Sequence, residues 1–269
     1  MEKRIRVMLD KNKYGPWAVV AGASEGLGLA FVRECAQAGI NVVMVARRAD
    51  LLETSSREIR EEYGVEVRTL QAELAKPGIV EEMRKVTDDI EVGLVIFNAA
   101  AANFKPFLEQ SEEELLAAIN LSCVGQSFIL QHYGRKMVER GHGGLMLISS
   151  LAGSAGIPNM GAYSGAKAYT DKLGEALWAE LKPKGVDVYV LVVGSTDTPR
   201  RRASGAKNVP GIPVLTPEEV AAHGVNNIAN GPLQVPPPLQ PMFEKIYTAD
   251  RAAAVNLQRS DAPVSDKIF

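Results

Sequence analysis

Short apolar runs alternate with longer segments of helical periodicity along the chain as far as residue 193. The apolar runs are rich in Val, Ile and Leu, as buried strands are, and they occupy 17–21, 41–46, 65–71, 94–98, 144–150 and 186–193. Apolar spacing typical of helices fills the segments between them, at 26–38, 49–63, 77–88, 112–139 and 162–181. This alternation predicts a single doubly wound α/β domain, in which helices cover both faces of a parallel sheet of about seven strands.

The pattern weakens beyond residue 193. Gly, Pro, Ser and Arg are frequent over 194–217 and predict a long loop, followed by a helix at 217–229 and a short strand at 233–235. Residues 1–13 are expected to form an N-terminal arm, either in water or as a short basic amphipathic segment on a membrane surface. Residues 14–269 then form one domain, with a substrate loop at about 194–216 and, at about 236–269, a C-terminal tail that is moderately helical at most.

Composition excludes several classes of function. Apolar residues make up 46% of the 269 and charged residues 23%, which suits one domain with a large core. The formal net charge of −2 does not indicate a nucleic-acid partner. Cys35 and Cys123 offer neither a disulfide framework nor the spacing of a metal site, so a reducing, cytoplasmic setting is expected. No apolar run reaches the length of a membrane span.

A glycine-rich turn joins the first predicted strand to the first predicted helix. Its glycines allow a tight turn and the close approach of a pyrophosphate, whose charge suits the free N–H groups of a helix N-terminus. Strand-to-helix turns that bind nothing also contain glycine, but the place of this turn at the first such junction favours a dinucleotide. The residues expected at this phosphate site are Gly22, Ser24, Glu25, Gly26, Leu27 and Gly28.

Two arginines follow the second predicted strand. In dinucleotide-binding folds an acid at this place accepts the ribose 2′-hydroxyl, whereas arginine accommodates a 2′-phosphate. Here the acid is missing, and Arg47 and Arg48 stand in its place. Guanidinium groups suit a phosphate dianion because they donate two parallel hydrogen bonds. A surface pair that merely ends a strand is the alternative, and we predict NADP(H) as the cofactor.

Tyr163 and Lys167 are four residues apart in a predicted helix, so their side chains lie on one face. A free phenol has a pKa of about 10 and is therefore a poor proton shuttle at neutral pH. A nearby positive charge favours the tyrosinate, so this pair is expected to lower the pKa of Tyr163. Ser150, at the end of an apolar run, is expected beside them, and together with the glycine-rich turn these residues indicate hydride chemistry.

Taken together, the chain from about residue 14 to residue 199 resembles the short-chain dehydrogenase/reductase family, and more narrowly a branch that includes bacterial hydroxysteroid dehydrogenases. The resemblance implies a Rossmann-type fold. It assigns catalytic roles to Asn120, Ser150, Tyr163 and Lys167. It also implies cofactor contacts from Glu73, Leu74, Asn98, Ala99, Tyr163, Lys167, Ser195, Thr196 and Thr198.

The chain departs from the family pattern at three places. The motif after the fourth strand keeps only Asn98 and Ala99 of the usual Asn-Asn-Ala-Gly, and Val193 stands where the family has Pro before Gly. Glu73 replaces the common Asp after the third strand. None of these changes removes a catalytic group, and they suggest a less typical branch.

The resemblance implies a proton transfer from Tyr163 to the alkoxide that forms as a hydride reaches a ketone. Ser150 would hold the carbonyl oxygen, and Lys167 would lower the pKa of Tyr163 and bind the nicotinamide ribose. Asn120 would anchor a water that relays protons from solvent to Lys167.

Loops at the carboxyl ends of the strands are expected to surround a hydrophobic substrate. The expected lining is Ser150, Leu151, Ile157, Met160 and Tyr163, together with Phe104 and Phe107 and with hydrogen bonds from Asn103 and Asn159. The arginines at 200–202 form either a solvated face, a cover for the cofactor phosphates, or an attraction for a carboxylate or acyl thioester.

The leading hypothesis is an NADP(H)-dependent oxidoreductase that interconverts a steroid-like ketone, or a similar carbonyl compound, and its secondary alcohol. A 3-oxoacyl-thioester reductase is the alternative within the same chemistry. A catalytically idle NADP-binding regulatory protein and an isomerase with tightly held cofactor are alternatives of other classes. The family resemblance also implies a homodimer or homotetramer formed through the helices at 112–139 and 162–181.

Overall fold

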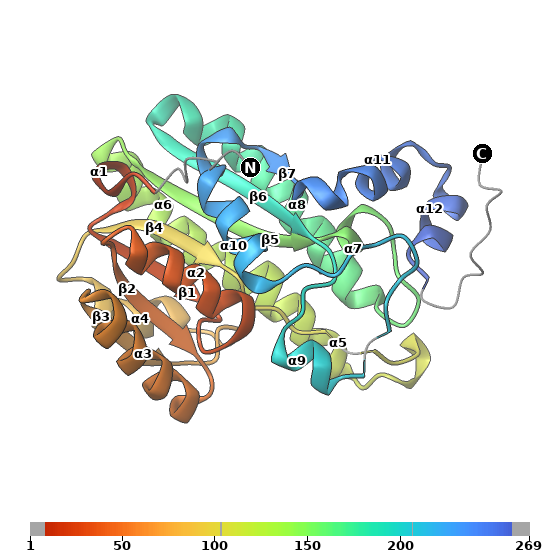
Figure 1. The fold of residues 1–269 in the computed structure, drawn as a ribbon, viewed down its shortest axis with the longest axis horizontal. Helices are drawn as coiled ribbons and strands as arrows, with labels where there is room; N and C mark the ends of the chain where they lie inside the picture. The colour runs from red at the N-terminus through yellow and green to blue at the C-terminus, as the bar shows by residue number, and fades with distance from the viewer. Residues whose placement is uncertain (1–8, 103, 206, 260–269) are drawn as a thin grey trace, which may run out of the picture.

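Seven parallel strands form one sheet in the computed structural model, which describes residues 9–102, 104–205 and 207–259 (Figure 1). The strand order is β3-β2-β1-β4-β5-β6-β7, and the predicted doubly wound fold is confirmed. The strands are β1 (Trp17–Ala21), β2 (Asn41–Ala46), β3 (Val67–Gln71), β4 (Val92–Phe97), β5 (Gly143–Ser150), β6 (Val186–Val193) and β7 (Leu233–Gln234). The first eight residues of the expected arm, the last ten of the tail, and Asn103 lie outside the described residues.

Helices cover both faces of the sheet (Figure 1). On one face α2 (Gly26–Gln37) and α3 (Ala49–Tyr63) pack on β1, β2 and β3, and α10 (Pro217–Asn226) packs on α2. On the other face lie α4 (Ile79–Thr87), α6 (Gln126–Arg140) and α8 (Gly161–Leu181). The central strands are apolar along their whole length because both of their faces are buried.

The helix predicted at 112–139 is one continuous helical stretch whose central turns are π-helical rather than α-helical. It consists of α5 (Glu112–Ile119), a π-helical segment η2 (Asn120–Gly125) and α6. A capping box between Ser111 and Glu114 begins it. By length and hydropathy alone the stretch Glu112–Arg140 could cross a membrane, a test that a core helix also passes. In the fold its α6 portion packs on β4 and β5 as a layer of the domain.

The C-terminal part of the chain is more helical than expected. The predicted loop at 194–217 contains α9 (Pro199–Ala203). The tail, expected to be moderately helical at most, contains α11 (Gln240–Thr248) and α12 (Arg251–Leu257). These helices are too short to show clear periodicity, and the side chains of Thr198 and Asp250 cap the starts of α9 and α12. The remaining short helices are α1 (Lys11–Tyr14), η1 (Phe107–Glu109), α7 (Leu151–Ser154), η3 (Lys182–Lys184), η4 (Ile228–Asn230) and η5 (Pro237–Leu239).

The short helix α1 ties the expected arm to the sheet. Tyr14 is buried, and its hydroxyl donates to Asp187 of β6 at 2.5 Å. Lys13 forms an ion pair with the same carboxylate. Residues 9–13 are therefore part of the folded domain rather than a solvated arm.

Candidate active site

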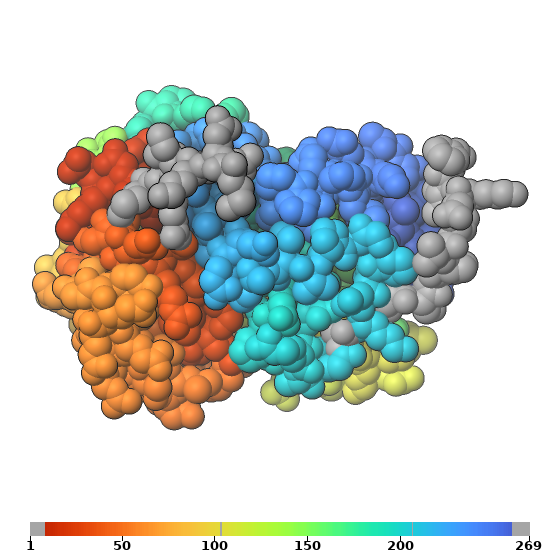
Figure 2. Space-filling view, viewed as in Figure 1, coloured from red at the N-terminus to blue at the C-terminus, as the bar shows by residue number. Residues whose placement is uncertain are grey.

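A cleft of about 1420 Å³ lies at the carboxyl ends of the parallel strands. Its walls come from the turn between β1 and α2, the ends of β2, β4, β5 and β6, and the segment around α9. In the space-filling view the segments at 194–205 and 207–217 (teal to cyan) lie between the first part of the chain, in red and orange, and the C-terminal helices in blue (Figure 2). Ligands of open parallel sheets bind at this place in the fold.

The glycine-rich turn is closed so tightly that only glycine fits. Gly22 and Gly26 have positive φ angles of 87° and 56°. A Cβ on Gly22 would lie 2.9 Å from the main chain of Ala99, and one on Gly28 would lie 1.8 Å from the oxygen of Gly22. The side chain of Asn98 donates to that same oxygen at 3.1 Å, so Asn98 braces the turn as well as lining the cleft.

The N-terminus of α2 faces the same cleft. Its first turn carries no acidic residue, and no side chain caps it. Gly22, Ser24, Glu25, Gly26 and Leu27 line the cleft at this end. Free N–H groups and a positive helix end, approached through a turn without side chains, fit the pyrophosphate of a dinucleotide.

The two arginines after β2 are each paired with an acid. Arg47 lies 3.5 Å from Glu73, and Arg48 lies 2.6 Å from Glu25, with half or more of each arginine side chain exposed. Exposed ion pairs of this kind are weak, so each guanidinium can leave its acid to bind another anion. The pairs lie at the end of the cleft where a 2′-phosphate is expected, and the donor set fits that group. Leu74 completes this wall, and its carbonyl oxygen leaves no room for a side chain at Gly125 of η2.

Ser150, Tyr163 and Lys167 come together at the middle of the cleft. Ser150 ends β5 and caps α7, where its hydroxyl accepts from the N–H of Ala152 at 3.2 Å. Tyr163 and Lys167 lie in the first turns of α8, with the ammonium 5.6 Å from the centre of the tyrosine ring. All three line the cleft.

The expected lowering of the Tyr163 pKa is wrong for this structure. Burial raises the pKa of Tyr163, and only in part do a hydrogen bond with Ser150 and the charge of Arg200 oppose this rise. The ammonium of Lys167 lies 5.6 Å from the centre of the Tyr163 ring and donates to the main-chain oxygen of Ile148 at 2.7 Å. The phenol is therefore held in its protonated form at neutral pH.

Lys167 is itself perturbed. Burial lowers its pKa to about 8, although Asp171 and Cys123 act in the opposite direction. Cys123 belongs to η2, the segment that begins with Asn120 and packs on α8. Asn120 is half-buried at the junction of α5 and η2 and is not among the residues that line the cleft.

The other end of the cleft is mainly apolar, as expected. Leu151, Ile157 and Met160 line it, and Asn159 lies beside them with a left-handed φ of 65°. Ser195, Thr196 and Thr198 follow β6 and line the cleft between the two ends. Of the two expected phenylalanines, Phe104 is a lining residue and is 63% exposed. Phe107 is absent from the lining and 57% exposed, because η1 turns it outward towards Gly161.

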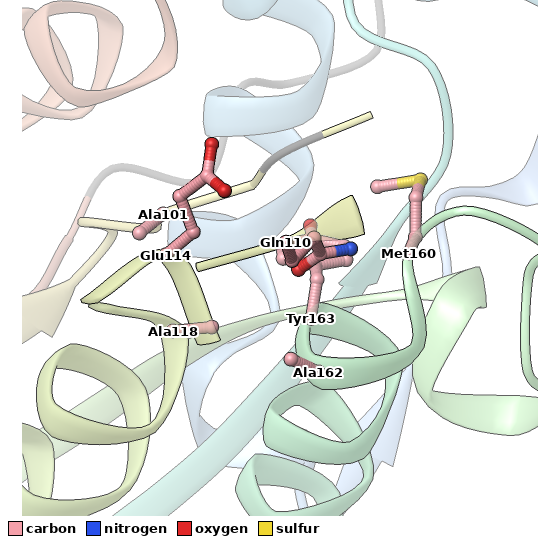
Figure 3. A pocket seen from close by; sticks show the side chains of 7 residues that line it. All are labelled: Ala101, Gln110, Glu114, Ala118, Met160, Ala162 and Tyr163. Carbon is pink, nitrogen blue, oxygen red and sulfur yellow. The ribbon is translucent and has the colours of Figure 1, made fainter. Parts of the chain in front are cut away.

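A small cavity of about 10 Å³ adjoins the cleft beside Tyr163 (Figure 3). Its walls come from the segment after β4, from α5 and from the start of α8. The lining residues are Ala101, Gln110, Glu114, Ala118, Met160, Ala162 and Tyr163.

Several residues at the site were not found from the sequence. Arg200 was known only as part of a basic run, and the structure places it in the cleft wall near Tyr163. Asp171 follows Lys167 by one helical turn, a spacing that could have indicated it. Lys207, Val209 and Ile212 line the cleft from the predicted substrate loop, whereas Gln258 and Arg259 of the C-terminal tail are unexpected lining residues that no local motif marks.

The chain is similar to known short-chain dehydrogenases. The family model described as short chain dehydrogenase matches residues 16–208. A 7beta-hydroxysteroid dehydrogenase of Collinsella aerofaciens is 36% identical over 217 residues, which are 78% of this chain and 81% of that protein.

Two solved structures have a similar fold. One is from a study of 7beta-hydroxysteroid dehydrogenase stereoselectivity, with a TM-score of 0.84 and 29% identity over 92% of this chain and 98% of the other. The second is a short-chain dehydrogenase from Sphingobium yanoikuyae in complex with NADPH, with a TM-score of 0.76 and 27% identity. That match covers 82% of this chain and 88% of the other.

Proposed function

The chain belongs to the short-chain dehydrogenase family, and on this premise we propose that it is an NADP(H)-dependent oxidoreductase that interconverts a hydrophobic ketone and its secondary alcohol. One observation carries the proposal. Ser150, Tyr163 and Lys167 meet in the middle of a cleft that has a glycine turn and two arginines at one end and apolar side chains at the other. The charged end suits the phosphates of NADP(H), and the apolar end suits the substrate.

The protein's own groups supply position and a proton. The bound nicotinamide would provide or accept the hydride. The hydroxyl of Ser150 donates a hydrogen bond to the carbonyl oxygen of the substrate, and Tyr163 gives its proton to the same oxygen as negative charge develops there. Because burial keeps the phenol protonated at neutral pH, the resting site is prepared for the reductive direction. Lys167 supplies the positive charge that supports the tyrosinate left behind, and Asn120 holds a water on the proton path to Lys167.

A steroid-like ketone is the substrate class that we favour. Leu151, Ile157 and Met160 form an apolar wall beside Tyr163, and the relative from Collinsella aerofaciens is named a 7beta-hydroxysteroid dehydrogenase. A 3-oxoacyl thioester is the second candidate. It is favoured by the presence of Arg200, Arg201 and Lys207 in the same cleft.

The test is the oxidation of NADPH, followed by the loss of its absorbance, with a panel of steroid, aryl and acyl-thioester ketones. Turnover with a steroid ketone is expected, and Tyr163→Phe should reduce it by about 10²- to 10⁴-fold, the usual contribution of a general acid. NADPH binding, measured by fluorescence, should be retained in this variant. Tyr169→Phe is the matched control, because that exposed hydroxyl on the same helix bonds only to Ser127 among the hydrogen bonds described.

Two outcomes would contradict the proposal. Normal turnover by Tyr163→Phe would remove the acid–base role. NADPH binding by the wild-type protein without oxidation by any ketone would favour the idle regulatory protein instead.

We also propose a homo-oligomer assembled through the long helices, in the cytoplasm. Exposed apolar side chains on these helices support the assembly, namely Leu116, Ile119, Val124, Phe128 and Tyr169. Both cysteines are free, which suits a reducing compartment. Light scattering of the wild type and of Phe128→Glu tests the assembly, and an oligomer that survives this change would exclude the face around Phe128.

A further inference from the structure

A buried acid stands directly behind the catalytic lysine. Asp171 follows Lys167 by one turn of α8, and the two residues are 2% and 3% exposed. Asp171 is absent from the cleft lining, so it touches neither substrate nor cofactor from this position. Acids are rarely buried to this extent without a partner, because the carboxylate loses its hydration.

The surroundings of Asp171 hold it close to Lys167. A Cβ on Gly153 of α7 would lie 2.7 Å from Oδ2 of Asp171 and 2.9 Å from the main-chain carbon of Lys167, so α7 packs against this turn without a side chain between them. Ser149 of β5 donates from its hydroxyl to the main-chain oxygen of Lys167 at 3.3 Å. Oδ1 of Asp171 has no hydrogen-bond partner among the described residues. Such an atom destabilises the fold, which suggests a role other than stability.

We infer that Asp171 is a positioning residue for the proposed reaction: its buried carboxylate keeps Lys167 in the ammonium form and so extends the pH range over which Tyr163 has a positive charge beside it. The inference rests on the proposed function, because it gives Lys167 a part in the reaction. The ammonium of Lys167 donates to the oxygen of Ile148, and a neutral amine would lose the charge that supports the tyrosinate.

Other charged and titratable groups face this pair from the elements packed around it. On α8 itself these groups are Lys172 and Glu175, on α11 Tyr247, and on η2 Cys123. Burial raises the pKa of Asp171 to about 6, and this rise is partly offset by a hydrogen bond with Ser149 and by the charge of Lys167, which both lower the pKa. Lys167 has a pKa lowered to about 8 by burial, against Asp171, which raises it. Between these values both groups are charged, and this is the range in which the pair operates.

The test is the pH profile of turnover for Asp171→Asn, which keeps the shape of the side chain and removes its charge. Without the carboxylate the pKa of Lys167 falls further, so the alkaline limb should move to lower pH by about one unit, a shift typical of a close charge partner. At a pH one unit above the new limb, turnover should then be about fivefold lower than in the wild type, and well above both limbs about tenfold lower. Glu175→Gln is the matched control, because it removes an acid from the next turn of α8, where Glu175 is partly exposed and paired with Lys172.

Ser149→Ala gives an independent test that does not depend on the folding of Asp171→Asn. Loss of this hydroxyl raises the pKa of Asp171, so the pH range over which folding depends on this acid should extend to higher pH. The readout is the pH dependence of the unfolding midpoint in urea without substrate.

The two proposals fail in different ways. An active enzyme whose alkaline limb is the same in the wild type and in Asp171→Asn, and whose unfolding midpoint has the same pH dependence in Ser149→Ala, would overturn the inference and leave the proposed function standing. If none of the ketones tested supports NADPH oxidation by the wild-type protein, the proposed function is overturned, whatever the unfolding data show for Asp171.

Discussion

Arg200 donates a hydrogen bond from its guanidinium to the main-chain oxygen of Ala100, 3.2 Å away, and so joins α9 to the segment that follows β4. The two segments are far apart in the sequence, and both line the cleft. The charge of Arg200 also lowers the pKa of Tyr163, against the larger effect of burial. This exposed arginine therefore closes the site and favours ionisation of the tyrosine.

Arg200→Gln should raise the pKa of Tyr163, because it removes a positive charge that favours the tyrosinate. Alcohol oxidation needs the tyrosinate, so the acid limb of its pH profile should move to higher pH by about one unit or less at low salt. Arg202→Gln is the control, since Arg202 pairs with Asp197 and is not in the cleft wall. Equal shifts in the two variants, or no shift at any ionic strength, would contradict this role of Arg200.

Arg47→Ala should weaken the use of NADPH far more than that of NADH. A charge-assisted hydrogen bond contributes about 1.5–3 kcal/mol, so the KM for NADPH should rise about tenfold or more while the KM for NADH stays unchanged. Steady-state kinetics with both cofactors measure this. Arg84→Ala is the control, because Arg84 lies on α4 and pairs with Asp88. Equal changes with the two cofactors would exclude a 2′-phosphate contact for Arg47.

Gly28→Ala and Gly165→Ala should have opposite effects on stability. A Cβ on Gly28 would lie 1.8 Å from the oxygen of Gly22, whereas one on Gly165 would meet nothing within 4 Å. Overpacking at Gly28 should lower the free energy of unfolding by about 1–3 kcal/mol or more and impair NADPH binding. Alanine at the exposed helical position 165 should raise the free energy of unfolding by about 0.4–1 kcal/mol. Urea unfolding measures both, and a Gly28→Ala variant that is as stable as the wild type would contradict the tight turn.

The free energy of unfolding should fall as the pH rises from about 4 to about 6, because Asp171 loses its proton over this range. The folded state raises the pKa of this acid from 3.8 to about 6, so the folded protein binds this proton more tightly than the unfolded chain does. The stabilising contribution is complete below pH 3.8 and is lost as the pH rises through about 6. Lys167 titrates in a separate window above about pH 8. In Asp171→Asn the urea midpoint of unfolding should depend less on pH between pH 4 and 6. If its slope against pH is the same as in the wild type, Asp171 ionises normally.

The regular part of the fold was predictable from the sequence because each element carries its own local signal. The helix Ala49–Tyr63 was predicted with its observed bounds, since Gly64 takes the left-handed conformation that ends it. The strand Val186–Val193 was also predicted with its observed bounds, as a run of residues buried on both faces. The short helices α9, α11 and α12 were missed because a few residues show too little periodicity.

The sequence alone also determined which groups carry the chemistry. A glycine turn after the first strand, two arginines after the second, and a tyrosine four residues before a lysine identify a dinucleotide fold with a proton donor, because backbone geometry ties these spacings to fixed places. The ionisation of those groups was decided by tertiary structure. Whether Tyr163 is a phenol or a tyrosinate depends on its burial, on Ser150 and on Arg200, which distant segments bring together. The pKa of a side chain reflects the solvent and charges around it, and only the folded chain defines them.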